Sequence, residues 1–220
     1  MHFFSVPSTI QGLFPACTWR KKCTEKIIYL TFDDGPHPVI TPWVIEQLKA
    51  YQAHATFFCV GENVNRYPAV CSLLLLNGHR LANHTMHHIK GWRTPNSKYF
   101  LDVDACEKAL EQVKADNVSE LEDQKLQKKR LFRPPYGQIT PSQIRHLAKL
   151  GYEIVQWSDL SCDYDPHLVT EKSLNALTKN IKPGNIVVFH DSEKAFEQMK
   201  QILPSYLSVA HAKGYQFKTL

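Results

Sequence analysis

The chain has 220 residues, of which 43% are hydrophobic and 21% are charged, and its formal net charge is +5. This composition is typical of an ordinary soluble globular protein with one domain, which at this size needs no disulfide staples. Lysine and arginine are scattered apart from two short runs at residues 20–22 and 128–130, so no nucleic-acid partner is expected.

The cysteines and the N-terminus indicate a compartment. None of the six cysteines forms a Cys-x-x-Cys pair, so we expect most of them to be free thiols in a reducing compartment. A disulfide between Cys17 and Cys23 is the alternative. The first 19 residues have no Lys or Arg ahead of their apolar part and are interrupted by two prolines. We therefore expect neither a signal peptide nor a membrane span, and a cytoplasmic location, with export by another route left open.

Apolar runs typical of strands alternate with stretches typical of helices along the whole chain. Two of the helices begin well, with Thr41 or Thr140 before a proline, and three end at Gly78, Gly151 or Gly214. The alternation predicts a parallel sheet, and about seven units without a dinucleotide-type glycine loop favour a closed or nearly closed barrel. The expected strands span residues 27–32, 55–60, 80–83, 130–132, 153–157, 185–190 and 216–219, and the expected helices span 41–51, 68–77, 98–115, 141–150, 170–180 and 193–210. Residues 116–129 are charged, and we expect an exposed loop or an extension of the preceding helix.

Two adjacent carboxylates, Asp33 and Asp34, follow the first expected strand. Burying such a pair is costly unless a cation, a proton or a hydrogen-bond donor lies between the two groups. Gly35 and Pro36 then turn the chain, which places the pair at the edge of the sheet where ligands bind in α/β proteins. A plain surface turn is the alternative, and the rest of the chain decides against it.

A histidine-rich segment follows the third expected strand. His84 and His88 are four residues apart, so on a helix they would project from the same face. Together with Asp34 they would supply the three ligands of an open, hydrolytic metal site. His87 could replace His88 on spacing grounds, but a separation of four suits a helix better than a separation of three.

Three further polar groups end later strands. Arg133 precedes a proline-rich turn, where a solvated arginine in a rigid loop is the alternative. Asp159, Asp163 and Asp165 follow the next strand, and could form an acidic turn. His190 ends an apolar strand, where a buried structural histidine is the alternative. Since all these groups fall at the same end of successive strands, the sequence predicts one shared site.

Together these segments resemble the motifs of the polysaccharide deacetylases, carbohydrate esterase family 4, with their nodulation-type chitooligosaccharide or peptidoglycan deacetylase domain. The first three motifs correspond to residues 31–36, 84–88 and 133–137, and the histidine of the fifth corresponds to His190. The resemblance implies a single catalytic domain, residues 25–220, with a distorted (β/α)7 barrel, preceded by an N-terminal extension, residues 1–24.

The fourth motif departs from the family pattern. Its Asp-Trp pair corresponds to Asp163 and Tyr164, and the usual leucine of the fifth motif is Val188. In the family these positions help form the small apolar pocket for the acyl methyl group. The acyl preference is therefore the property that these two changes leave open.

The resemblance implies a metal-dependent enzyme that hydrolyses the N-acetyl group of N-acetylglucosamine-containing glycans, peptidoglycan or chitooligosaccharide, and releases acetate. Asp34, His84 and His88 would hold one divalent ion, most simply Zn²⁺, although such ligands also accept Co²⁺ or Ni²⁺. Which glycan is the substrate, and the oligomeric state, are left open.

The implied catalytic roles fall on five residues. Asp33 would act as the general base, and Arg133 would orient it. The backbone N–H of Tyr136 would stabilise the oxyanion. His190 would protonate the leaving amine, with Asp163 keeping its imidazole charged and aligned.

The same residues are compatible with other functions. The same site could serve a deformylase or an amidase acting on a lipid-linked sugar, a polyamine or a small cyclic amide. The domain could also be a non-catalytic glycan-binding module, or a structural protein with a bound ion. Trp92, Tyr99 and Trp157 could stack on sugars, although core or rim packing is the commoner role for such residues.

Overall fold

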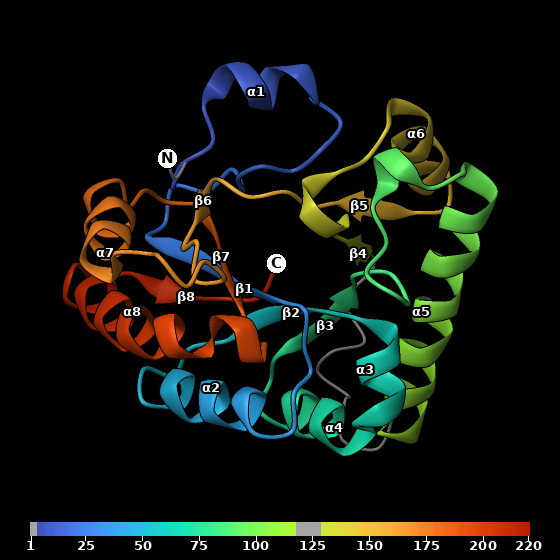
Figure 1. Cartoon of the computed structure of the whole chain (residues 1–220). Helices are drawn as coiled ribbons and strands as arrows, with labels where there is room; N and C mark the ends of the chain where they lie inside the picture. Colours follow the sequence, from blue (N-terminus) through green and yellow to red (C-terminus); the bar gives the residue numbers. More distant parts are fainter. Residues whose placement is uncertain (1–3, 118–128) are drawn as a thin grey trace.

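The computed structural model describes residues 4–117 and 129–220. Its strands form a parallel sheet in the order β5-β4-β3-β2-β1-β7-β6, with β8 beside β1. The helices lie around the outside of this curled sheet (Figure 1). The strands are β1 (Ile27–Asp33), β2 (Ala55–Cys59), β3 (Arg80–Asn83), β4 (Arg130–Phe132), β5 (Tyr152–Ile154), β6 (Asp159–Leu160), β7 (Ile186–His190) and β8 (Gln216–Phe217). The helices are α1 (Ser8–Leu13), α2 (Ile40–Lys49), α3 (Gly61–Arg66), α4 (Pro68–Leu76), α5 (Asn96–Asp116), α6 (Pro141–Lys149), α7 (Thr170–Lys179) and α8 (Glu193–Ala212).

The expected strand and helix order is confirmed, with three differences. The strand expected at 153–157 ends at Ile154, and β6 is a separate strand of two residues. The short helices α1 and α3 were not predicted. Residues 118–128 of the charged stretch lie outside the described residues, while α5 extends to Asp116.

The barrel is distorted because its sheet is incomplete. In the described part of the chain β5 and β6 end the strand path and do not pair with each other. The N-terminal segment crosses this opening: Thr18 bridges to Val155, whereas Ser5 bridges to Asp159. Residues 4–24, expected to be an extension, therefore contribute hydrogen bonds to both sides of the sheet opening.

The alternation of side chains along β1 separates the core from the site. Phe32 points outward, where its ring stacks on Phe57 at 4.9 Å and on Phe189 at 6.0 Å between centroids. Because successive side chains of a strand point to opposite faces, Thr31 and Asp33 point into the barrel. Both contact Arg133 there.

The strand register brings the expected site segments to one edge of the sheet. Asp33 of β1 lies opposite His190 of β7, and Asn83 of β3 lies opposite Phe132 of β4. All the paired strands are parallel, so their carboxyl ends meet at this edge, which is where α/β barrels bind their ligands.

Two further findings concern the cysteines and the helices. All six cysteines are free thiols, and five of them are buried. No helix in residues 4–117 or 129–220 has the length and hydropathy that crossing a bilayer requires.

Candidate metal centre

The loops after β1 and β3 bring one carboxylate and two imidazoles together. Oδ1 of Asp34 lies 3.1 Å from Nε2 of His88 and 3.7 Å from Nε2 of His84. The three ligand atoms all lie within 4.8 Å of one another. Ligands placed about 2.0–2.2 Å from a tetrahedral zinc ion are about 3.4 Å apart. The spacing and the donor set therefore fit a divalent cation of this kind.

His84 is fixed as a neutral ligand. Its Nδ1 lies 2.7 Å from the carbonyl oxygen of Arg133, so Nδ1–H donates there and the lone pair of Nε2 faces Asp34. Burial lowers the pKa of His84 to about 4. A histidine must be deprotonated to bind a metal, and this one is neutral at physiological pH.

Asp34 is held as a carboxylate. Burial alone would raise its pKa, but the hydrogen bond from His88 and the neighbouring His190 and His84 hold the pKa of Asp34 well below its usual range. Its backbone has a φ of 77°, in the left-handed region that favours glycine. This unusual backbone accompanies the placement of the carboxylate beside the two histidines.

The histidine segment is a loop, so the prediction that His84 and His88 share a helix face is wrong. Residues 84–88 contain no helix, and Thr85 and His88 have φ angles of 66° and 52°. Left-handed backbone at these two residues folds the loop back on itself. The two imidazoles consequently meet, with ring centroids 5.0 Å apart, as the spacing suggested but by a different route.

A second carboxylate, that of Asp33, is held by an arginine rather than by the histidines. Its Oδ1 accepts a hydrogen bond of 2.7 Å from Arg133, which also donates to Thr31. The guanidinium is fully buried and lies 4.1 Å from the ring centroid of Phe58. Burial lowers the pKa of Arg133, whereas Asp33 opposes this effect. The pair is thus a buried ion pair in which Arg133 fixes the direction of the carboxylate.

His190 and Asp163 form a second charged pair in the site. Nδ1 of His190 lies 2.7 Å from one oxygen of Asp163, and the backbone N–H of His190 donates to the other at 2.9 Å. Burial alone would lower the pKa of His190, but Asp163, with help from Asp34 and Asp33, raises it to about 9. The imidazole is therefore protonated at neutral pH.

Asp33, Asp34, His84, His88 and His190 line one pocket of about 460 Å³, whereas the buried Arg133 and Asp163 are not part of its lining. Its apolar wall includes Trp157, Leu160, Tyr164 and Val188. Tyr164 and Val188 thus line the pocket, as the resemblance to the family implied. The full lining consists of Asp33, Asp34, His84, His88, Tyr136, Trp157, Leu160, Tyr164, Val188, His190 and Lys194.

Tyr136 lies on the side of this pocket that carries His88. Its ring centroid lies 4.7 Å from that of His88, and Lys90 lies over the ring. The residue belongs to a short 3₁₀ turn (Pro135–Gly137) and has φ 59° and ψ 13°, uncommon for a residue other than glycine. Such backbone strain is often stored where a main-chain group serves a ligand.

Several residues that the sequence singled out lie elsewhere. His87 turns away from the triad and contacts Asp102. Asp159 is a structural residue that accepts hydrogen bonds from Ser5 and Ser158. Tyr99 is fully buried in the core and Trp92 is exposed outside the pocket, so of the three candidate aromatic residues only Trp157 lines it.

Asp191, which sequence reasoning missed, supports the turn that carries the carboxylate pair. Its buried carboxylate accepts hydrogen bonds from the Gly35 amide at 3.1 Å and from the Thr41 hydroxyl at 2.5 Å. Burial, with the field of Asp34, raises the pKa of Asp191 to about 8, although these hydrogen bonds oppose the shift. In the sequence, only its position directly after His190 pointed to a role for Asp191. No sequence feature pointed to Lys194 or Leu160 as residues of the pocket.

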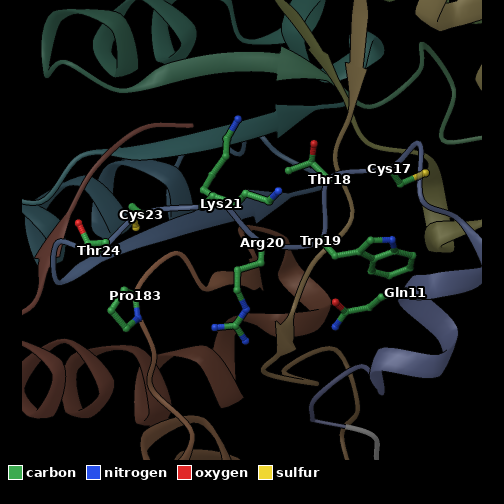
Figure 2. A pocket seen from close by; sticks show the side chains of 10 residues that line it. Gln11, Cys17, Thr18, Trp19, Arg20, Lys21, Cys23, Thr24 and Pro183 are labelled. Atoms are coloured by element: carbon green, nitrogen blue, oxygen red, sulfur yellow. The ribbon is translucent and has the colours of Figure 1, made fainter.

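A larger hollow lies away from this site. It measures about 900 Å³ and is formed by the N-terminal segment beside the starts of β1 and β7. Figure 2 shows Trp19, Arg20 and Lys21 around it. None of its lining residues belongs to the segments that match the family motifs, whereas the smaller pocket is lined by Asp34, His84, His88 and His190, which do.

Known proteins include sequences and structures similar to this chain. The sequence profile of the polysaccharide deacetylase family matches residues 20–155. A peptidoglycan-N-acetylglucosamine deacetylase of Bacillus cereus is 34% identical over 207 residues, which cover 92% of this chain and 90% of the relative. A chitooligosaccharide deacetylase of Azorhizobium caulinodans is 32% identical, over 76% of this chain and 74% of the relative. The crystal structure of the Bc1960 peptidoglycan N-acetylglucosamine deacetylase superposes with a TM-score of 0.84 at 24% identity, covering 97% of this chain and 95% of the other.

Proposed function

The chain belongs to the polysaccharide deacetylase family, and on that premise we propose that it removes acetate from N-acetylglucosamine units of a glycan, peptidoglycan or chitooligosaccharide. The named relatives are deacetylases, and enzymes of this family are metal-dependent hydrolases. Relatives named for both glycans align over most of their length with it. The observation that carries the proposal is the pocket in which the Asp34, His84 and His88 triad adjoins Asp33 and His190.

We assign the cation to the triad and take Zn²⁺ as the simplest occupant. One carboxylate and two imidazoles are its usual ligands in hydrolytic sites, although Co²⁺ and Ni²⁺ accept the same donors. When bound, such a cation lowers the pKa of a water molecule to about 7 and polarises an amide carbonyl. The neutral state of His84 and the anionic state of Asp34 suit this role.

Asp33 takes the proton of the attacking water. Arg133 holds one carboxylate oxygen at 2.7 Å, which leaves the other free to accept that proton. The buried ion pair keeps the carboxylate in one orientation, so the base needs no rearrangement before it acts. A general base in this position is worth about 10²–10⁴ in rate.

His190 gives its proton to the departing amine. An amine leaves poorly unless it is protonated, and the raised pKa of His190 supplies the proton at neutral pH. Asp163 holds Nδ1, so Nε2 faces the pocket as the donor. The main-chain N–H of Tyr136 donates to the carbonyl oxygen as negative charge develops there, a contribution typically worth about 3 kcal/mol.

The apolar wall bounds the acyl group. Tyr164 packs edge-on against His190, with ring centroids 5.2 Å apart, and Val188, two residues before that histidine, also lines the pocket. A tyrosine carries a polar hydroxyl where a tryptophan would fill the space with ring atoms. This departure from the family pattern leaves the acyl preference open, so the assay includes N-formyl substrates.

The decisive experiment is acyl release by purified protein on chitooligosaccharides and on peptidoglycan, with the metal content measured in the same sample. Acetate release that stops with a chelator and returns with Zn²⁺ is the expected result. Formate release from N-formyl substrates, with no acetate from N-acetyl ones, would favour the deformylase. Glycan binding with no product after metal addition would favour a non-catalytic module.

A further inference from the structure

The loop that carries His88 is hydrogen-bonded to α5 through Asp102. One carboxylate oxygen of Asp102 accepts the backbone N–H of His87 at 3.0 Å, and the other contacts Nδ1 of the same residue at 2.6 Å. The backbone carbonyl of Asp102 accepts the N–H of Met86 at 3.1 Å. Asp102 is 7% exposed, so its carboxylate is largely shielded from water. Two successive residues ahead of His88 are thus held by one helical residue.

His88 depends on this attachment more than its partner ligand does. His84 is fully enclosed and its Nδ1 is anchored on the Arg133 carbonyl. The side chain of His88 is 27% exposed, and its Nδ1 makes no hydrogen bond within the residues that the structure describes. Apart from its contacts with Asp34, His84 and Tyr136, its ring is placed by its backbone, which has a φ of 52°. What fixes that backbone also fixes the ligand atom.

The same contact decides which histidine of the loop can reach the cation. His87 and His88 are adjacent, and either could follow His84 at a ligand spacing. The bond to Asp102 points Nδ1 of His87 at α5, and the side chain remains 55% exposed. An imidazole engaged in this way is unable to compete with His88 for the triad.

We propose that Asp102 is a positioning residue, which by hydrogen bonding to His87 holds His88 in its ligating position and keeps His87 out of the metal site. The proposal rests on the proposed function only through the identity of the triad as a metal site. Residues that orient metal ligands from outside typically change metal affinity 10- to 100-fold. Asp102 does not contact a ligand directly but acts through the backbone of the loop that carries His88. We therefore expect a change in metal affinity at the lower end of that range.

The variants separate hydrogen bonding from packing. Asp102→Ala removes both acceptors and should weaken Zn²⁺ binding about 10-fold. Asp102→Asn can accept from the backbone N–H and donate to the imidazole in its other tautomer, so it should bind within about threefold of wild type. The matched control is Asp104→Ala on the same helix, where an exposed carboxylate pairs with Lys108 at 2.7 Å. It should bind Zn²⁺ like wild type.

The measurement is competition for Zn²⁺ between the full-length metal-free chain and a chromophoric chelator, with thermal unfolding recorded for each variant. Zn²⁺ binding by Asp102→Ala as tight as that of the Asp104→Ala control would overturn the proposal. So would an Asp102→Asn variant as weak as Asp102→Ala. At saturating Zn²⁺, kcat should recover to within a fewfold, because the loop acts on metal affinity.

A second variant covers the case in which Asp102→Ala fails to fold. His87→Ala removes the side-chain contact with Asp102 but retains the backbone hydrogen bond, so it should weaken Zn²⁺ binding relative to the Asp104→Ala control. Zn²⁺ binding by His87→Ala as tight as that of the control would then refute the proposal. Zn²⁺ binding is measured without substrate, so the two proposals can fail separately. If the variants show the expected ranking of Zn²⁺ affinities but the wild type releases no acetate, the proposed function is refuted and the positioning role of Asp102 stands.

Discussion

Replacing Asp163 with asparagine removes the charge that keeps His190 protonated, and the effect can be calculated from the site. The carboxylate contacts both Nδ1 and the backbone N–H of His190. It is the largest of the influences that raise the pKa of His190 to about 9, against a burial effect that would lower it. Without it we expect the pKa to return to the ordinary value of about 6.5 or below.

The size of the effect depends on pH. At pH 8, a group of pKa about 9 is about nine-tenths protonated, whereas one of pKa about 6.5 is about 3% protonated. Asp163→Asn should therefore lose about 30-fold in kcat/KM at pH 8, but less than about twofold at pH 6 from protonation alone. The alkaline limb of kcat/KM, which reports the acid of the free enzyme, should move downward by more than two pH units.

The assay is acetate release from a chitooligosaccharide across pH 5.5–10 at saturating metal, with both proteins side by side. A bound cation cancels part of the field of Asp33 and Asp34 at His190, but it does so equally in wild type and variant. The difference in pH between the alkaline limbs of the two kcat/KM profiles therefore measures the effect of Asp163. Equal losses at pH 6 and pH 8, with the alkaline limb unmoved, would refute the argument that this carboxylate acts through charge.

Three more substitutions test the other parts of the site. Asp33→Asn should keep the wild-type metal content and lower kcat by about 10²–10⁴; full turnover by acetate assay would exclude it as the base. His84→Ala should lose metal and activity together, and wild-type metal content by elemental analysis would disprove the ligand assignment. Gly35→Ala would place a Cβ atom into the Asp191 carboxylate, so stability should fall by about 1–3 kcal/mol in chemical unfolding. An unchanged free energy of unfolding would mean that this turn has more room than the structure indicates.

The fold could be predicted from sequence where periodicity and boundary residues agreed. Thr140 does cap α6, with Gln143 completing the capping box. Thr41, in contrast, lies inside α2, and its hydroxyl donates to Asp191 instead. The sequence Thr-Pro is the same at both positions, so it cannot distinguish a helix cap from a residue inside the helix. For Thr41 the deciding partner is Asp191, which lies 150 residues away in the sequence.

The open side of the barrel could not be predicted for a similar reason. β6 has two residues, too few for a pattern of alternation. Isolated bridges such as that between Thr18 and Val155 carry no sequence signal. The cytoplasmic location and the division at residue 24 stay predictions.

In the site, residue identity was predictable but local conformation was not. His84 and His88 meet, yet through a loop with two left-handed residues rather than through a helix. Spacing alone fixes how far apart two side chains can be, whereas their approach depends on φ angles that Thr85 and His88 rarely adopt by preference. The contact between His87 and Asp102, made with a helix 15 residues further on, decides which histidine is free to bind.

The two neighbouring aspartates show how one dipeptide provides two distinct chemical groups. In a regular strand Asp33 and Asp34 would point to opposite faces, and one of them would be lost to the site. Asp33 keeps the strand geometry and enters the barrel, where Arg133 binds it. Asp34 leaves the strand with a φ of 77°, which returns its carboxylate to the same cavity on the side of the histidines. One carboxylate is therefore neutralised by a fixed guanidinium and the other is left for a cation, so the repulsion between them is balanced by two different positive charges.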